Sequence, residues 1–259
     1  MTAVSRVRLD VAIAERGLAP SRERARALIL AGRVRVDGVV VDKAGTAVTP
    51  HAAVEVTEPD FPWVGRGGVK LAHALDVFRI SVAGREALDI GASTGGFTDV
   101  LLTRGATRVT ALDVGHGQLD WRLREDPRVI VIERRNARDL DVAWLPGTVD
   151  IVTIDVSFIS LRLILPAVPA VLRPGADVVA LVKPQFEAGR EQVGKGGLVH
   201  DLAVHEMVIE RVSDAAVRCG LTRIGRTASP ITGATGNQEY LLHLRPGSGL
   251  ESAGSRKEQ

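Results

Sequence analysis

The chain has 259 residues, of which 45% are hydrophobic and 25% charged, a composition typical of a globular protein with a sizeable core. Its one cysteine, Cys219, excludes an internal disulfide and a zinc site built from several cysteines. The six histidines lack the spacing of metal ligands, so no metal site is predicted. No apolar run approaches the ~20 residues of a membrane span, and the N-terminus lacks a signal-peptide core, so we expect a cytoplasmic protein with no membrane partner.

The net charge of +2 is unevenly distributed along the chain. Between Ser5 and Arg35, eight arginines and no lysine stand against three acidic residues. A guanidinium group binds phosphate oxygens through two parallel hydrogen bonds, so this segment favours contacts with nucleic-acid phosphates. The alternative is an ordinary solvated helix face.

The first part of the sequence predicts a compact α+β module. A helical pattern over 8–16 ends at Gly17, and a second helix begins at Ser21 as N-cap and ends at Gly32. Alternating valines then predict short strands at 34–36, 39–41 and 54–56, the first two joined by an Asp-Gly turn.

After a proline-containing linker the pattern changes to strands that alternate with helices. The expected strands are 86–91, 108–113, 128–133, 150–155, 177–183, 222–228 and 239–245. The expected helices are 68–79, 97–104, 161–171 and 203–219. This alternation predicts an α/β, Rossmann-like domain with a largely parallel sheet covered by helices on both faces. We divide the chain into an N-terminal domain at 6–58, a linker at 59–66, a catalytic domain at 67–245 and a disordered tail at 246–259.

Residues 88–98, Leu-Asp-Ile-Gly-Ala-Ser-Thr-Gly-Gly-Phe-Thr, run from an apolar strand through a loop of small residues into a helix. Such a loop lets the backbone approach a ligand closely. The second glycine of the dinucleotide fingerprint is missing, which weakens the case for NAD. Asp113 ends the next strand, where its carboxylate can accept both ribose hydroxyls of an adenosine, and Asp89 is placed near a methionine ammonium. The pattern therefore favours S-adenosylmethionine, and a tight turn without a ligand is the alternative.

Four polar residues stand at strand ends or at the entrance to the second domain. Asp155 and Lys183 each end an apolar strand, Glu239 begins the last strand, and Lys70 stands at the start of the first helix of the domain. A lysine at the end of an apolar strand is costly unless it has a partner. Lys183 could pair with Asp155 only to hold the sheet, or it could carry chemistry.

Two resemblances give these patterns a meaning. Residues 7–57, with the run S-R-E-R-A-R-A-L-I-L-A-G-R-V-R-V-D-G, resemble the alpha-L RNA-binding fold. The motifs D-I-G-A-S-T-G-G-F, D-V-S-F-I-S, L-V-K-P-Q-F-E and G-N-Q-E-Y resemble those of FtsJ-type ribose 2′-O-methyltransferases. Together, over residues 6–245, they resemble the TlyA family of rRNA (cytidine-2′-O)-methyltransferases, which has also been labelled haemolysin A.

The resemblance implies a fold with a seven-stranded, mostly parallel sheet and a set of site residues. The catalytic residues would be Lys70, Asp155, Lys183 and Glu239. The cofactor would contact Asp89, Gly91, Ala92, Ser93, Thr94, Gly95, Phe97, Thr98, Asp113, Asn136 and Asp155. RNA would contact Arg6, Arg22, Arg26, Arg33, Arg66, Arg190 and Lys195, although the last two also fit plain surface loops.

We therefore expect a monomeric enzyme that transfers a methyl group from S-adenosylmethionine to cytidine riboses of ribosomal RNA in ribosomal subunits. Lys183 would act either as the base or as a charged group that orients the hydroxyl. The alternatives are a ribosome-binding assembly factor without activity and, less favoured, a membrane-active haemolysin.

Overall fold

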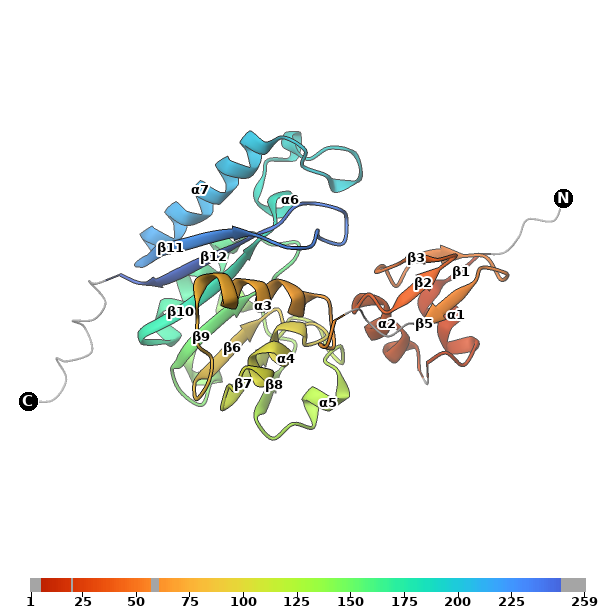
Figure 1. Cartoon of the computed structure of the whole chain (residues 1–259), viewed down its shortest axis with the longest axis horizontal. Helices are drawn as coiled ribbons and strands as arrows, with labels where there is room; N and C mark the ends of the chain where they lie inside the picture. Colours follow the sequence, from red (N-terminus) through yellow and green to blue (C-terminus); the bar gives the residue numbers. More distant parts are fainter. Residues whose placement is uncertain (1–5, 20, 57–60, 248–259) are drawn as a thin grey trace, which may run out of the picture.

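The computed structural model describes residues 6–19, 21–56 and 61–247. A small N-terminal part (residues 6–56) lies beside a larger part (residues 61–247) that is built around one twisted sheet (Figure 1). Residues 57–60, which include the start of the predicted linker, and 248–259, which include most of the predicted tail, lie outside the described residues. Pro246, the first residue of that predicted tail, ends a strand.

The N-terminal part has the predicted α+β composition. Its elements are β1 (Val7–Arg8), α1 (Leu9–Glu15), α2 (Arg22–Leu30), β2 (Val34–Val36), β3 (Val39–Val40), β4 (Ala47–Val48) and β5 (Val54–Val56). Ser21 caps α2 by accepting a hydrogen bond from the Arg24 N–H. β2 pairs antiparallel with β3, as the Asp-Gly turn predicts, and its other edge pairs antiparallel with β5. β1 also pairs with β4, which the sequence did not predict because two-residue strands are too short to show alternation.

Seven strands form the sheet of the larger part, in the order β11-β12-β10-β9-β6-β7-β8. They are β6 (Glu86–Ile90), β7 (Arg108–Leu112), β8 (Val129–Ile132), β9 (Val149–Ile154), β10 (Leu172–Val182), β11 (Leu221–Ala228) and β12 (Tyr240–Pro246). β12 is antiparallel to both of its neighbours, and the remaining described pairings are parallel. The predicted seven-stranded, mostly parallel sheet is confirmed.

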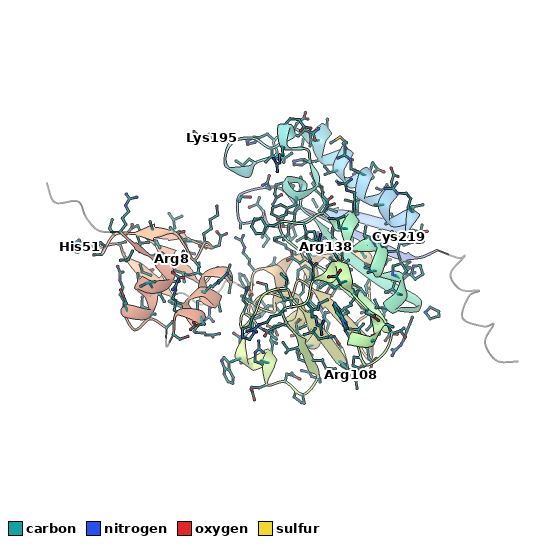
Figure 2. All side chains as sticks on the ribbon, turned by 180° about the vertical axis from the view of Figure 1, so that it is seen from behind. Arg8, His51, Arg108, Arg138, Lys195 and Cys219 are labelled. Atoms are coloured by element: carbon teal, nitrogen blue, oxygen red, sulfur yellow. The ribbon has the colours of Figure 1, made fainter. Side chains whose placement is uncertain are left out.

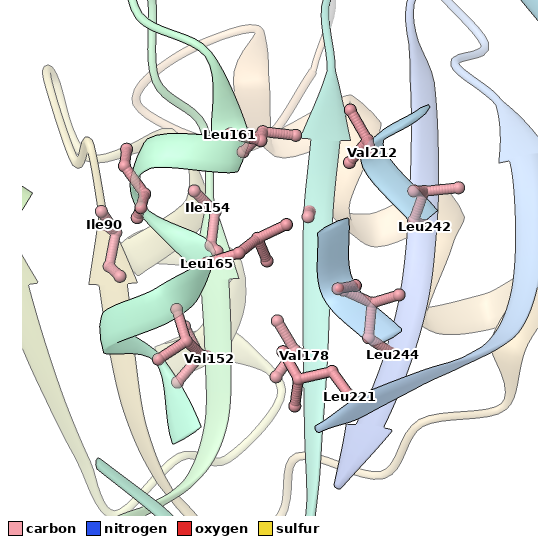
Figure 3. Packing of buried hydrophobic residues seen from close by; sticks show 14 of the residues in the cluster. Ile90, Val152, Ile154, Leu161, Leu165, Val178, Val212, Leu221, Leu242 and Leu244 are labelled. Atoms are coloured by element: carbon pink, nitrogen blue, oxygen red, sulfur yellow. The ribbon is translucent and has the colours of Figure 1, made fainter. Parts of the chain in front are cut away.

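Helices cover both faces of this sheet, as predicted. The α-helices are α3 (Gly67–Phe78), α4 (Gly96–Thr103), α5 (Trp121–Arg124), α6 (Pro184–Glu187) and α7 (Leu202–Arg218). Short 3₁₀ turns are η1 (Ala137–Asp139), η2 (Val142–Trp144), η6 (Arg190–Gln192) and η7 (Lys195–Gly197). Alternate residues of β10 serve two cores, because Val178 packs with α7 on one face (Figure 3) and Val179 packs with α3 and α4 on the other.

One predicted helix is wrong. Residues 161–171 form three consecutive 3₁₀ turns, η3 (Leu161–Leu163), η4 (Leu165–Ala167) and η5 (Pro169–Val171), instead of an α-helix. Pro166 and Pro169 lack the N–H groups that an α-helix requires, so the apolar spacing is satisfied by tighter turns. β10 begins at Leu172, five residues before the predicted start, across an irregularity in its pairing with β9.

A buried carboxylate ties the middle of this sheet together at the amino-terminal end of β6. Asp177 of β10, whose side chain is 4% exposed, accepts hydrogen bonds from Arg85 Nη1 at 2.8 Å and Arg245 Nε at 2.7 Å. His243 Nε2 of β12 lies 2.7 Å from the same carboxylate. Burial alone would raise the pKa of Asp177, but the bonds from His243, Arg245 and Arg85 hold it well below its usual range. The carboxylate is therefore charged and fully partnered.

We expect Asp177→Asn to lower the melting temperature, because it leaves two arginines with a weaker acceptor in a buried place. At neutral pH the loss should be about 2–4 kcal/mol of unfolding free energy. The folded pKa is depressed, so this stabilisation is present above the unfolded pKa and is lost as the pH falls through the folded one. The difference between variant and wild type, measured by thermal unfolding from pH 7 downward, should shrink in acid. A difference that stays constant with pH would contradict this assignment.

Candidate active site

The loop after β6 is built for close approach between two strand ends. Gly91 has φ +84°, and a Cβ added to it would lie 2.2 Å from the carbonyl oxygen of Asp155 at the end of β9. β6 and β9 are neighbours, while the chain leaves β6 toward β7 on its other side. This is the point in an open α/β sheet where the strand order reverses and ligands bind.

A cavity of about 120 Å³ opens at this point. It is lined by Leu30, Arg66, Gly67, Lys70, Gly91, Ala92, Ser93, Thr94, Gly96, Phe97 and Asp155. The predicted loop, the start of α3 and the end of β9 therefore share one cavity. Leu30 comes from α2 of the N-terminal part, so both parts of the chain contribute to its wall.

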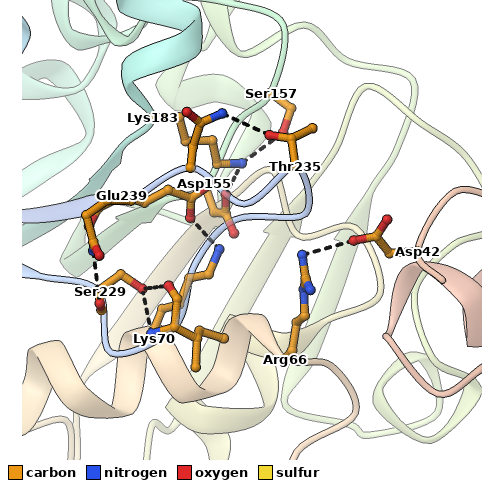
Figure 4. Close-up of polar contacts among 12 residues, drawn as sticks. Asp42, Arg66, Lys70, Asp155, Ser157, Lys183, Ser229, Thr235 and Glu239 are labelled. Carbon is orange, nitrogen blue, oxygen red and sulfur yellow. Dashed lines mark hydrogen bonds and ion pairs between the residues drawn. The ribbon is translucent and has the colours of Figure 1, made fainter. Parts of the chain in front are cut away.

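The four predicted catalytic residues form two lysine–carboxylate pairs beside this cavity (Figure 4). Lys70 Nζ lies 2.5 Å from Glu239 Oε2, and the two side chains are only 7% and 3% exposed. Lys183 Nζ lies 2.6 Å from Asp155 Oδ1 and donates a hydrogen bond to Ser157 Oγ at 2.8 Å. Both pairs join segments that are distant in the sequence.

The Asp155 carboxylate is held in its charged form. Burial raises the pKa of Asp155, but the positive charges of Lys183, Lys70 and Arg66 lower it by a larger amount. The pKa of Asp155 therefore lies below its ordinary value. Asp155 is therefore a weak proton acceptor and a strong electrostatic partner for a cation.

Two buried polar side chains that sequence reasoning missed hold the loops around these pairs. Glu187 of α6 accepts hydrogen bonds from Ser160 Oγ and the Leu161 N–H, both at 2.6 Å, and so fixes the loop that follows Asp155. Asn237 accepts from the Val199 N–H and donates to the Gly197 carbonyl, which ties the loop before α7 to the loop before β12. Glu187 belongs to the motif L-V-K-P-Q-F-E and Asn237 to G-N-Q-E-Y, but their roles become visible only from their buried contacts.

An exposed aromatic side chain stands next to the same site. Phe158 is 91% exposed and has φ +65°, an unfavourable backbone conformation for a bulky residue. Its ring centroid lies 5.0 Å from that of Phe186. The sequence pattern did not predict that Phe158 is exposed, because an aromatic residue beside apolar residues is normally assigned to the core.

The residues expected to contact the cofactor fall into two groups. Six of them, Gly91, Ala92, Ser93, Thr94, Phe97 and Asp155, line the cavity. Asp113 lies beside it and accepts hydrogen bonds from the Ser93 N–H at 2.8 Å and the Gly115 N–H at 2.6 Å.

The other group lies behind or away from the cavity wall. Gly95 has φ +97° and packs against Leu119 and Leu123. Asp89 is fully buried, and its carboxylate accepts hydrogen bonds from Thr98 Oγ1 and Thr153 Oγ1. Asn136 caps η1 by accepting from the Arg138 N–H.

The residues expected to contact RNA lie in both parts of the chain. Arg6, Arg22, Arg26, Arg190 and Lys195 are exposed, and Arg33 and Arg66 are half-buried. Arg22 pairs with Asp10 at 3.0 Å and Arg66 pairs with Asp42 at 3.1 Å. Lys195 projects from the segment between α6 and α7, on the side of the larger part that faces the N-terminal part (Figure 2).

Comparisons with known proteins identify the families to which the two parts of the chain are similar. A family model of FtsJ-like methyltransferases matches residues 63–246, and an S4 domain model matches residues 7–54. The 16S/23S rRNA (cytidine-2′-O)-methyltransferase TlyA of Mycobacterium tuberculosis is 52% identical over 241 residues, 93% of this chain and 90% of that protein. Hemolysin A of Brachyspira hyodysenteriae is 43% identical over 239 residues, 92% of this chain and 99% of that protein.

Solved structures extend the similarity to the fold. A Streptococcus thermophilus protein that carries a hemolysin label has a TM-score of 0.74 and 45% identity, with 95% of this chain and 90% of that chain covered. A Listeria monocytogenes protein labelled as an S-adenosylmethionine-dependent methyltransferase, 18% identical with a TM-score of 0.51, shares the fold over 70% of this chain and 98% of its own. No helix within residues 6–19, 21–56 and 61–247 is long and apolar enough to cross a membrane.

We expect Gly91→Ala to destabilise the protein by about 2 kcal/mol or more, because it combines a left-handed backbone with a collision against the Asp155 carbonyl. Gly147→Ala is the matched control, since a Cβ there meets nothing within 4 Å. Thermal unfolding of both variants measures the difference. Equal melting temperatures would show that the two strand ends are not in contact.

Asp89→Asn tests the buried carboxyl behind the loop. Burial raises the pKa of Asp89 to about 7, against the hydrogen bonds from Thr98 and Thr153, while the unfolded chain ionises near 3.8. As the pH rises from about 4 to 7 the unfolded state loses its proton first, so this group costs stability, on the order of 4 kcal/mol at most. The melting temperature of the variant minus that of wild type should therefore increase between pH 5 and pH 8. A flat difference would contradict the raised pKa.

Proposed function

Because the chain belongs to the family of FtsJ-like methyltransferases that carry an N-terminal S4 domain, we propose that it methylates the ribose 2′-hydroxyl of cytidine in ribosomal RNA, with S-adenosylmethionine as the methyl donor. The observation that carries the proposal is the convergence of Lys70–Glu239 and Lys183–Asp155 next to the Gly91 cavity. Binding and transfer can then take place at one edge of the sheet.

The residues around the cavity fit S-adenosylmethionine. Gly91 leaves room where any side chain would collide with Asp155, and the Ser93 N–H holds the Asp113 carboxylate next to the loop. Each oxygen of Asp113 accepts one backbone N–H and retains a lone pair, with which it can accept a ribose hydroxyl of the adenosine. Asp89, buried behind the wall, supports the loop through the hydrogen bonds that it accepts from Thr98 and Thr153, and in its ionised form it adds negative potential toward the methionine ammonium. When bound, the donor supplies a methyl group that its positively charged sulfur already activates.

Lys183 and Asp155 hold the acceptor hydroxyl in our proposal. We assign Lys183, which pairs with Asp155 and donates to Ser157, as an ammonium that orients the 2′-oxygen and stabilises the negative charge that develops on it, while the hydroxyl proton passes to solvent water. Lys70, fixed by the buried Glu239, adds a second positive charge beside the cavity. A base role would require Lys183 to lose its proton before the reaction.

The RNA would lie across both parts of the chain. Phosphate contacts would come from four arginines of the N-terminal part, Arg6, Arg22, Arg26 and Arg33, and from Arg190 and Lys195 at the loop before α7. Phe158, which projects into solvent near Lys183, offers a ring on which a base can stack. Since a relative is named for both 16S and 23S RNA, the substrate of this chain is to be sought in both ribosomal subunits of the cytoplasm.

The test is transfer of a tritiated methyl group from S-adenosylmethionine to purified small and large subunits that lack the modification, followed by mapping of the labelled ribose. We expect wild type to label at least one subunit and Lys183→Ala to reduce the rate by about 100-fold or more, with binding of the donor and of RNA retained. Lys43→Ala, at an exposed lysine of the N-terminal part, should leave the rate unchanged.

Lys183→Arg separates the two possible roles, because arginine keeps the charge and cannot accept a proton at working pH. An orienting role predicts a rate for Lys183→Arg above that of Lys183→Ala, whereas a base role predicts equal loss. Wild type that binds RNA and S-adenosylmethionine without labelling either subunit would refute the proposal and favour an assembly factor. Leakage of liposomes caused by the pure protein would instead support the hypothesis of a membrane-active haemolysin.

A further inference from the structure

An ion pair joins the N-terminal part directly to the neighbourhood of the cofactor loop. Arg24, on α2, places Nη1 3.1 Å from Asp120 Oδ2, at the start of α5. The two side chains are 28% and 8% exposed, so the pair is largely shielded from water. Burial would raise the pKa of Asp120, but the Arg122 N–H and the Arg24 side chain hold it below its usual value. The charged carboxylate of Asp120 in the larger part is thus bound by Arg24 of the N-terminal part.

Asp120 is in turn bonded to the loop that is expected to hold the cofactor. Its backbone N–H donates to the Thr94 carbonyl at 3.1 Å, while its other carboxylate oxygen caps α5 by accepting the Arg122 N–H at 3.0 Å. Leu119 and Leu123, on either side of Asp120 in the sequence, pack against this loop at Gly95. A Cβ added to Gly95 would lie 2.8 Å from Leu119 and 2.2 Å from Leu123.

The loop itself needs such support. Gly91, Ser93 and Gly95 all have positive φ, at 84°, 49° and 97°, and Ser93 pays a conformational cost that a glycine would not. A loop with three such residues loses much conformational freedom when it adopts one shape. Contacts that hold it in the binding shape before the ligand arrives therefore increase affinity.

The contact between the two parts is continuous with the cavity wall. A small cavity lies between α2 and the loop, lined by Leu28 and Ala31 on one side and by Thr94 and Gln118 on the other. Leu30, which stands between Leu28 and Ala31 in the sequence, lines the main cavity. A change at the α2 surface is therefore transmitted through direct packing.

We propose that Arg24 and Asp120 are positioning residues for the cofactor loop, so that the RNA-binding part of the chain sets the affinity of the catalytic part for S-adenosylmethionine. Arg24 acts on Asp120, Asp120 fixes Thr94 and the cap of α5, and α5 supports the turn at Gly95. This inference rests on the proposed function. By linkage, bound S-adenosylmethionine strengthens the contact between the two parts by the same factor.

The test uses the full chain, S-adenosylmethionine alone and isothermal titration calorimetry, without RNA. We expect Arg24→Gln and Asp120→Asn each to weaken binding by about five- to tenfold. The double variant should be no weaker than either single variant, because the two residues act as one unit. Arg24→Lys should recover part of the affinity. Arg35→Gln, which removes the same charge from the same part of the chain, is the matched control and should bind like wild type.

Kinetics and unfolding distinguish positioning from a general structural role. Arg24→Gln should raise the KM for S-adenosylmethionine and leave kcat at saturating donor near wild type, with little change in melting temperature. Wild-type affinity in Arg24→Gln, or losses that add in the double variant, would overturn the inference and leave the proposed function intact. Failure of wild type itself to bind S-adenosylmethionine would instead overturn the proposed function.

Discussion

The contact on which the rest of the site depends is that between the ends of β6 and β9. The backbone of Gly91 approaches the Asp155 carbonyl so closely that only a hydrogen fits in place of a side chain. That approach places the loop of small residues directly beside the last carboxylate of the neighbouring strand. The loop that we propose to bind the cofactor and the charged side chain of Asp155 thereby line one cavity, and neither can shift along its strand without the other.

Two lysine–carboxylate ion pairs hold the charged side chains of this site in place. Each lysine has a carboxylate within ion-pair distance. Asp155 and Lys183 follow the neighbouring strands β9 and β10, whereas Lys70 on α3 meets Glu239 just before β12. A buried ion without its partner is strongly unfavourable, so the pairs also specify the arrangement of strands around them. The same logic applies at the opposite ends of the strands, where Asp177 of β10 binds Arg85 before β6 and both His243 and Arg245 of β12. The sheet is thus fixed electrostatically at both ends of its strands.

Much of this fold could be predicted from the sequence, because periodic apolar runs record which faces are buried. Apart from the early start of β10, the predicted strands and most predicted helices of the larger part begin and end within about one residue of expectation. Lys70, Asp155, Lys183 and Glu239 also meet as two ion pairs. The failures share a physical cause. Pro166 and Pro169 replaced an α-helix by 3₁₀ turns although the apolar spacing is helical. Glu187, Asn237 and Asp120 work through buried contacts between distant segments, which no local pattern records.

The insertion of β12 between β10 and β11 has a consequence for how the protein is made functional. Lys70 and its partner Glu239 are 169 residues apart, so their meeting requires nearly the whole larger part to be in place. Contacts of such long range form late and slowly during folding. Glu239 directly precedes β12, so the Lys70–Glu239 pair is complete only when the last strand lies between β10 and β11. The correct placement of the last segment of the sheet is thereby a condition for the charge arrangement at the cavity.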